Sequence, residues 1–156
     1  MHTILNASDS EEVTIYTDGA CKGNPGPGGW GAVLLYKKVE KQFSGSENNT
    51  TNNRMEITAA IEALKRLKRP CRVSLYTDSS YLQQGVTCWI ANWKKKNWKT
   101  SNKKPVKNID LWQELDDLTS EHEISWQWVK AHNGNKWNEL ADQLASSAAM
   151  ELKNNS

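Results

Sequence analysis

The chain has 156 residues, the length of one ordinary domain with room for a hydrophobic core. Hydrophobic residues make up 37% of it, charged residues make up 24%, and the net charge is +2. No apolar run approaches the roughly 18 residues that a membrane span needs, which excludes a transmembrane protein. No basic segment followed by an apolar one opens the chain, and Cys21, Cys71 and Cys88 show no C-x-x-C spacing. We therefore expect a cytoplasmic protein without a secretory signal, a disulfide framework or a zinc site.

The charge is distributed unevenly along the chain. Residues 89–107, WIANWKKKNWKTSNKKPVK, hold seven lysines and no acid, and the rest of the chain carries a net charge of −5. The same segment contains Trp89, Trp93 and Trp98. Lysines interleaved with aromatic rings are typical of a surface that binds nucleic acid. The alternative is a solvated basic segment whose tryptophans belong to the core.

The first elements in chain order are strands. Residues 13–18, VTIYTD, predict a strand that ends near Asp18, because β-branched and aromatic residues lead into the turn-rich sequence GACKGNPGPGG. That glycine-proline sequence lacks the G-K-[S/T] ending of a phosphate-binding loop, so a tight connection is expected. Residues 30–36 and 39–44 predict two further strands. Together the three strands form an antiparallel meander.

A helix is predicted for residues 52–68, where apolar residues recur on one face until Pro70 stops the pattern. The next strand, VSLYTD at residues 73–78, repeats the pattern of the first strand, VTIYTD. A strand–helix–strand connection favours parallel pairing with a right-handed crossover, which brings both C-terminal ends to one edge of the sheet. Asp18 and Asp78 are therefore predicted to be neighbours.

The remaining elements continue this α/β pattern. They are a short helix at 79–88, a helix at 109–118, a strand at 123–129, a polar loop at 130–135 and a last helix that carries Asp142. We expect one domain over residues 13–150, with flexible ends at 1–12 and 151–156.

Two neighbouring aspartates suggest a metal site. Like carboxylates at close range repel each other unless a proton or a cation compensates them, and hard cations such as Mg²⁺ prefer carboxylate oxygen. Glu56, in the first turn of its helix, and Asp142 could converge on the same edge. Each also has a simpler explanation, Glu56 as a partner of the helix dipole and Asp142 as a solvated helix residue.

Five motifs follow one another over about Val13 to Met150: TDGACKGNPGPGGWGA, TTNNRMEITAAIEAL, YTDSSY, NWKKKNWKTSNKKPVKNIDLW and WVKAHNGNKWNELADQLA. Together and in this order they resemble the bacterial-type ribonuclease HI family. The resemblance implies a ribonuclease H-like α/β fold: a five-stranded mixed sheet with an antiparallel meander of strands 1–3, parallel strands 4 and 5, and flanking helices. It also implies an endonuclease that hydrolyses the RNA strand of RNA/DNA hybrids without sequence preference and leaves 3′-hydroxyl and 5′-phosphate ends. The sequence carries no signal for oligomerisation, so a monomer is the default expectation.

The resemblance assigns the roles of catalytic carboxylate and metal ligand to Asp18, Glu56, Asp78 and Asp142. These four acids would hold two Mg²⁺ ions, with Mn²⁺ as a substitute, on either side of the scissile phosphate. His132, in the loop AHNGN, is expected to serve in proton transfer or product departure. The loop departs from the G-H-x-G-H pattern of many relatives, which leaves the mobility of the loop open.

The resemblance also divides the substrate contacts between the two strands of the hybrid. Beside Glu56, the residues expected to face the 2′-hydroxyl groups of the RNA are Cys21, Asn24, Asn52 and Ser79. Asn52 has the alternative role of a helix cap. The residues expected to hold the DNA strand are Thr51 and Asn108, at a phosphate pocket, and Trp89 and Trp93, at a deoxyribose channel. A basic protrusion at about 89–107, which includes Lys94, Lys95 and Lys96, would bind the hybrid by charge. Asn49 replaces an arginine of some relatives, which predicts weaker phosphate binding.

Two other functions stay open at this point. One is a catalytically silent module that binds hybrid or RNA through the same basic segment, and the intact set of four acids argues against it. The other is a different nuclease on the same fold, such as an exonuclease or a resolvase-like enzyme for DNA junctions. The lysine-rich insertion and the NNRME motif favour the hybrid-directed enzyme over that alternative, since a fold alone does not decide function.

Overall fold

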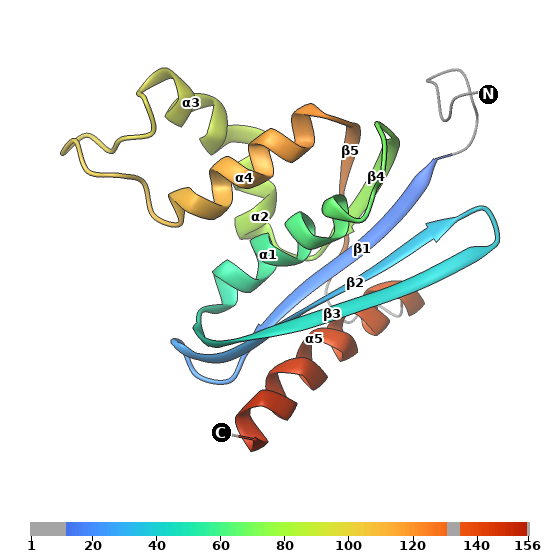
Figure 1. Ribbon diagram of the computed structural model, residues 1–156. Coiled ribbons are helices and arrows are strands. Elements are labelled where there is room, and N and C mark those ends of the chain that lie inside the picture. The colour runs from blue at the N-terminus through green and yellow to red at the C-terminus, as the bar shows by residue number, and fades with distance from the viewer. Residues whose placement is uncertain (1–11, 131–134, 156) are drawn as a thin grey trace.

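The structure is a computed structural model that describes residues 12–130 and 135–155. Its centre is a five-stranded sheet with the strand order β3-β2-β1-β4-β5 (Figure 1). The strands are β1 Val13–Cys21, β2 Gly26–Tyr36, β3 Val39–Thr50, β4 Arg72–Thr77 and β5 Glu123–Trp128. Strands β1 to β3 form an antiparallel meander, whereas β1, β4 and β5 run parallel. The predicted mixed sheet is confirmed.

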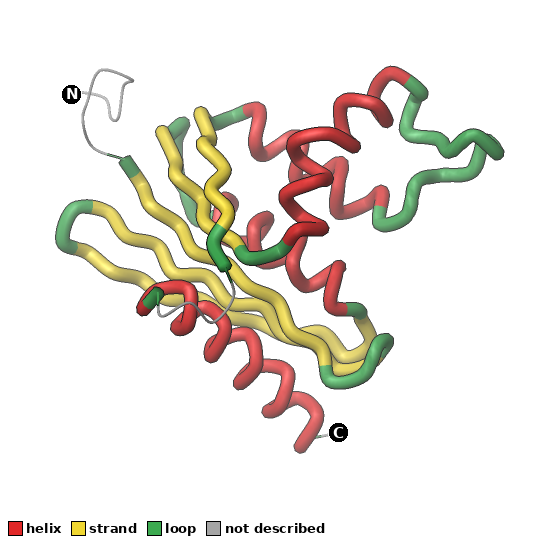
Figure 2. The backbone as a smooth tube through the Cα atoms, turned by 180° about the vertical axis from the view of Figure 1, so that it is seen from behind, coloured by secondary structure: helices red, strands yellow, loops and turns green. Residues whose placement is uncertain are grey.

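Helices cover both faces of this sheet. Helix α1, Asn52–Lys65, lies on one face and helix α5, Lys136–Asn154, lies on the other, as the two opposite views show (Figures 1 and 2). Helix α4, Ile109–Ser120, packs beside α1. The chain between β4 and α4 forms helix α2, Ser80–Gln84, the π-helix η1, Gly85–Trp89, and helix α3, Ile90–Lys95, followed by a loop that projects away from the sheet. None of the helices in the described part of the chain is long and apolar enough to cross a membrane.

Two hydrophobic cores fix the helices against the sheet. Successive side chains of a strand point to opposite faces, so that Ile15 of β1 enters the larger core with α1 and α4, and Tyr16 enters the smaller core with α5. Trp112 of α4 is fully buried in the larger core, and Ala141 of α5 is fully buried in the smaller one. Because both faces are packed, α1 and α5 have defined positions, and these helices carry Glu56 and Asp142.

The predicted boundaries of β1 and β2 were wrong, because the glycine-rich segment belongs to the sheet. Strand β1 continues past Asp18 to Cys21, and β2 begins at Gly26 rather than at residue 30. A Cβ atom at Gly29 would lie 2.4 Å from the carbonyl oxygen of Ala145 in α5. Glycine is therefore needed here because α5 crosses the strand too closely to leave room for a side chain. The sequence analysis interpreted the same glycines as part of a tight turn.

The helices that follow β4 also differ from the prediction. A single short helix at 79–88 is replaced by α2, η1 and α3, which continue to Lys95. Within this run Gly85 lies against Trp112, and a Cβ atom there would be 2.0 Å from the Trp112 ring. At the other end of the chain, α5 continues to Asn154, and the amide of Asn155 donates to the carbonyl of Glu151 and closes the last turn.

Candidate active site

Asp18 and Asp78 lie level with each other at the C-terminal end of β4, where β1 continues beside β2. In the parallel pair of β1 and β4, Tyr16 lies opposite Tyr76, and the two rings stack with their centroids 4.6 Å apart. Each aspartate follows two residues after its tyrosine, so the same register brings them together. Asp18 is 7% exposed, and its carboxylate Oδ1 accepts a hydrogen bond of 2.9 Å from the amide of Gly19.

Two glycines let the helices bring the other acids to this end of the sheet. A Cβ atom at Gly19 would lie 2.5 Å from the amide nitrogen of Glu56, and one at Gly31 would lie 2.5 Å from the carbonyl oxygen of Ala141. Without side chains at these points, α1 and α5 approach the strands closely. Asp142, one residue after Ala141, consequently lies within hydrogen-bond reach of Asp18. The structure thus gathers all four predicted carboxylates.

The electrostatics of the cluster disfavour a full set of negative charges. Burial, together with the charges of Asp78 and Asp142 and a hydrogen bond with Asp142, raises the pKa of Asp18 to about 9, against the smaller opposing effect of the Gly19 amide. Burial also raises the pKa of Glu56, helped by the charge of Asp78 and opposed by hydrogen bonds from Ser79 and Asn52. Asp18 and Glu56 therefore hold a proton to higher pH than ordinary carboxylates do.

The chemistry of this donor set fits hard divalent cations. Four carboxylates meet at a partly buried edge, and carboxylate oxygen is the preferred ligand of Mg²⁺ and Mn²⁺. Within residues 12–130 and 135–155, no three His, Cys, Asp or Glu side chains already have the arrangement of a formed metal site. Glu56 is instead bonded to Ser79 Oγ and to Asn52 Nδ2. Metal binding would therefore exchange these hydrogen bonds for metal–oxygen contacts.

The residues predicted for the RNA strand surround Glu56. Asn52 Nδ2 donates to Glu56 at 3.0 Å, and the Asn52 amide donates to Asn24 Oδ1 at 3.2 Å. Ser79 Oγ donates to Glu56 and also caps α2 by accepting from the amide of Leu82. Cys21 lies at the end of β1, where its thiol contacts the carbonyl of Thr50 at the end of β3. The helix cap of α1 is Thr51, so the alternative role of Asn52 as the cap was wrong.

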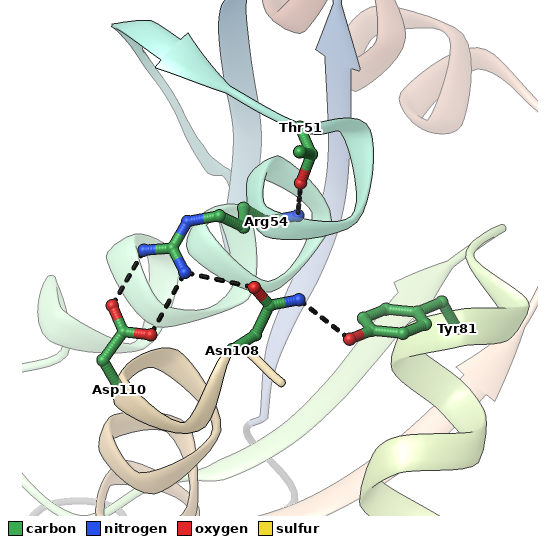
Figure 3. A network of polar contacts seen from close by, with 5 residues as sticks. All are labelled: Thr51, Arg54, Tyr81, Asn108 and Asp110. Atoms are coloured by element: carbon green, nitrogen blue, oxygen red, sulfur yellow. Dashed lines mark hydrogen bonds and ion pairs between the residues drawn. The ribbon is translucent and has the colours of Figure 1, made fainter. Parts of the chain in front are cut away.

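Thr51 and Asn108, the residues predicted for a phosphate of the DNA strand, belong to a second polar cluster made by α1, α2 and the start of α4 (Figure 3). Thr51 Oγ1 accepts from the amide of Arg54 at 3.2 Å. The Arg54 guanidinium donates to Asn108 Oδ1 at 3.1 Å and to both carboxylate oxygens of Asp110 at 3.1 and 2.8 Å. Asn108 Nδ2 in turn donates to Tyr81 Oη at 2.9 Å.

Sequence reasoning missed Arg54, Tyr81 and Asp110 in this polar cluster. Arg54 lies within the NNRME motif, but the side chains that it contacts are more than fifty residues away. The local sequence contains no spacing or composition that signals such a contact. The only available signal was the position of Asp110 in the first turn of a predicted helix, and that position is explained equally well by the helix dipole.

Trp89 and Trp93 are part of an aromatic cluster as well as of the surface. Both are half-buried; their rings lie 5.9 Å apart, and that of Trp93 lies 5.8 Å from the ring of the buried Trp112. Their inner edges therefore contribute to the core, as the alternative interpretation proposed, while the remainder of each ring stays accessible. Beyond them the loop after α3 projects from the body (Figure 1).

The three lysines at the end of α3 are exposed but differ in their surroundings. Lys94 Nζ lies 3.2 Å from a carboxylate oxygen of Asp116 in α4, and this ion pair ties α3 to α4. Lys95 and Lys96 are exposed at the base of the projecting loop. His132, predicted to serve in proton transfer or product departure, lies outside the described residues.

Comparisons with known proteins agree with this fold. The sequence profile of the RNase H family matches residues 10–150. The chain is 63% identical to ribonuclease H of Nitrosococcus oceani over 139 residues, 89% of this chain and 95% of that protein. It is 60% identical to ribonuclease H of Stutzerimonas stutzeri over 141 residues, 90% of this chain and 93% of that protein.

Among solved structures, the chain is similar to the crystal structure of LC9-RNase H1, described as a type 1 RNase H with the type 2 active-site motif. The TM-score is 0.84 at 34% sequence identity, over 94% of this chain and 76% of that one. A family profile that spans nearly the whole sequence, relatives at about 60% identity and a shared fold lead to one conclusion. The chain belongs to the RNase H family of metal-dependent nucleases.

Proposed function

We propose that the protein is an endonuclease that hydrolyses the RNA strand of RNA/DNA hybrids without sequence preference and leaves 3′-hydroxyl and 5′-phosphate ends. One observation carries the proposal. Burial, together with the neighbouring Asp78 and Asp142, raises the pKa of Asp18 to about 9, and Glu56 completes the same cluster. Such a set of acids suits metal-assisted phosphodiester hydrolysis, and the identity to ribonucleases H supports the choice of substrate.

The four acids would hold two Mg²⁺ ions, for which Mn²⁺ can substitute. When bound, such a pair activates a water for attack and stabilises the leaving oxygen of the phosphodiester. The contribution of the chain is to hold the carboxylates on rigid elements and to keep Asp18 away from bulk water.

The two strands of the hybrid would lie on the two polar clusters. Cys21, Asn24, Asn52 and Ser79 would face the RNA strand near Glu56, where the 2′-hydroxyl distinguishes RNA from DNA. Thr51 and Asn108 would contact a phosphate of the DNA strand, and the accessible parts of Trp89 and Trp93 would pack against its deoxyriboses. Lys95 and Lys96, with Lys94 as a weaker contributor because of its ion pair with Asp116, would attract the hybrid by charge.

The remaining parts of the proposal concern turnover, domain organisation and location. His132 would move a proton or assist product departure, since imidazole titrates near neutral pH. Residues 13–150 would form one catalytic domain, which acts as a monomer in the cytoplasm. These statements rest on the sequence and on the family.

The test compares cleavage of an RNA/DNA hybrid with that of single-stranded RNA, duplex RNA and duplex DNA of the same sequence, in the presence of Mg²⁺. Cleavage confined to the RNA strand of the hybrid, and lost in Asp78→Asn, is the expected result. Asp117→Asn, which removes an exposed acid of α4, serves as the matched control and should cleave like the wild type. Binding without cleavage would identify a silent module, whereas cleavage of DNA would place the protein among other nucleases of this fold.

A further inference from the structure

We propose that Arg54 is a positioning residue that orients the side-chain amide of Asn108, so that its N–H group points toward a phosphate of the DNA strand. The inference rests on the proposed function, in which Thr51 and Asn108 contact that phosphate. Arg54 acts through Asn108, because its own guanidinium is engaged with the first turn of α4 (Figure 3).

The backbone of Asn108 shows that its side chain has a use outside its own helix. Asn108 is the N-cap residue of α4, with a left-handed backbone at φ 60° and ψ 29°. An asparagine at this position usually has extended backbone angles, and its oxygen accepts from an amide of the following turn. Asn108 makes no such capping bond. Asparagine enters this left-handed region more readily than most residues with a side chain. Its side chain is free of the capping role and bonds to Arg54 and Tyr81 instead.

Arg54 and Tyr81 together determine which end of the Asn108 amide faces which neighbour. A guanidinium has donors only, so the atom that faces Arg54 Nη1 at 3.1 Å has to be the amide oxygen. The amide nitrogen then lies on the other side, where one of its hydrogens goes to Tyr81 Oη at 2.9 Å. The second hydrogen remains for another acceptor, such as a phosphate oxygen. A flipped amide would present its oxygen to the phosphate and repel it.

Asp110 holds the guanidinium in the orientation that this arrangement requires. Asp110 accepts from Nη1 at 3.1 Å and from Nη2 at 2.8 Å, and this bidentate pair of hydrogen bonds fixes the guanidinium plane. The hydrogen bond from Arg54 lowers the pKa of Asp110, and that same bond raises the pKa of Arg54, so both groups stay charged. A lysine has no planar fork and could not serve Asp110 and Asn108 in the same geometry.

The experiment measures KM and kcat for a hybrid substrate in a double-mutant cycle of Arg54→Ala and Asn108→Ala. Each single variant should raise KM about tenfold, the loss of one hydrogen bond to a charged group, and leave kcat within about twofold of the wild type. The double variant should resemble either single variant, because both remove the same contact. Arg54→Lys should behave like Arg54→Ala. Arg66→Ala is the matched control, since Arg66 also forms an ion pair on α1, with Glu62, and should keep the wild-type KM.

A further variant, Asn108→Asp, keeps an acceptor for Arg54 but replaces the N–H donor with a carboxylate oxygen. Its KM should exceed that of Asn108→Ala, because the carboxylate repels the phosphate. Additive effects in the double variant, or a wild-type KM in Asn108→Asp, would overturn the positioning role of Arg54. An unchanged KM in Asn108→Ala, with hybrid cleavage intact, would remove the phosphate contact and the inference with it while leaving the proposed reaction standing. Loss of hybrid cleavage in the wild type would contradict the proposed function itself.

Discussion

Replacing the most buried acid of the active site should stabilise the metal-free protein. In Asp18→Asn the carboxylate becomes a neutral amide of nearly the same shape, whose oxygen can still accept from the Gly19 amide. The substitution removes the repulsion from Asp78 and Asp142 and the cost of burying a charge. The free energy of unfolding should therefore rise, although the same change should abolish hydrolysis.

The size and the pH dependence of this effect follow from the pKa of Asp18. The pKa of Asp18 is about 9 in the folded chain, whereas an ordinary aspartate has a pKa of 3.8. Below about pH 4 the Asp18 carboxyl is protonated in both the folded and the unfolded chain, and its titration does not lower the free energy of unfolding. As pH rises above that value, the unfolded chain releases the proton while the folded chain retains it, so folding loses about 1.4 kcal/mol per pH unit up to about pH 9. The cost at pH 7 is at most about 4 kcal/mol, and relaxation of the neighbouring acids should reduce the measured gain to about 2 kcal/mol.

Urea unfolding in the presence of a chelator, at about pH 5 and about pH 8, measures this gain. The stability difference between Asp18→Asn and the wild type should be larger at the higher pH. A gain of about 2 kcal/mol corresponds to a melting temperature higher by roughly 4–8 °C for a chain of this size. Asp117→Asn, the exposed control, should show no gain at either pH. A variant that is less stable than the wild type, or equally stabilised at both pH values, would refute the reasoning.

Three further predictions address other parts of the structure. Gly85→Ala should lower the free energy of unfolding by about 3 kcal/mol, because its methyl group would collide with the Trp112 ring, and a gain or no change in urea unfolding would contradict this packing. His122 Nδ1 accepts from the amide of Cys71 at 3.0 Å, and burial lowers its pKa, so stability should fall as pH drops below about 6.5. That fall should be smaller in His122→Asn, which supplies an uncharged acceptor; equal slopes would exclude the histidine as the cause. Alanine at all three lysines of residues 94–96 should raise KM and flatten its log–log dependence on salt by about 2, since one of the three already has an acid partner; an unchanged slope would leave the protrusion only a role in solubility.

The sheet was predictable from sequence because its strands carry strong and repeated patterns. The VTIYTD and VSLYTD segments are both buried strands, and their similarity reflects equivalent positions in the parallel pair of β1 and β4. The glycines of β2 were not predictable as strand residues, because their reason lies in α5, more than a hundred residues further along the chain. Gly29 has no side chain because the backbone of Ala145 lies there. The local sequence at such a site predicts a turn, whereas packing against α5 makes the same residues part of a strand.

The candidate site was predictable to the extent that it lies on regular elements. Strand register places Asp18 and Asp78 together, and the resemblance to a known family added Glu56 and Asp142. The sequence contains no comparable signal for the contacts of Arg54, because a long arginine side chain can reach partners in many directions. Which partners it contacts depends on where α4 begins. That start depends on a left-handed residue, Asn108, for which the sequence predicted a phosphate contact but no backbone angle.

Helices α1 and α5 approach the strands closely, and this packing brings the acids together at a cost in free energy. The same packing should therefore couple metal binding to folding. Because Gly19 and Gly31 bring both helices close to the strands, Asp18 is buried beside like charges, and a divalent cation would relieve both costs. A ligand that binds only the folded chain stabilises it by about 2.7 kcal/mol at a hundred times its Kd. Mg²⁺ should therefore raise the melting temperature of the wild type and raise that of Asp18→Asn much less, so that the difference seen in chelator narrows or reverses. Equal shifts in the two proteins would mean that Asp18 does not contribute to the metal site, and the acid cluster would then need another explanation.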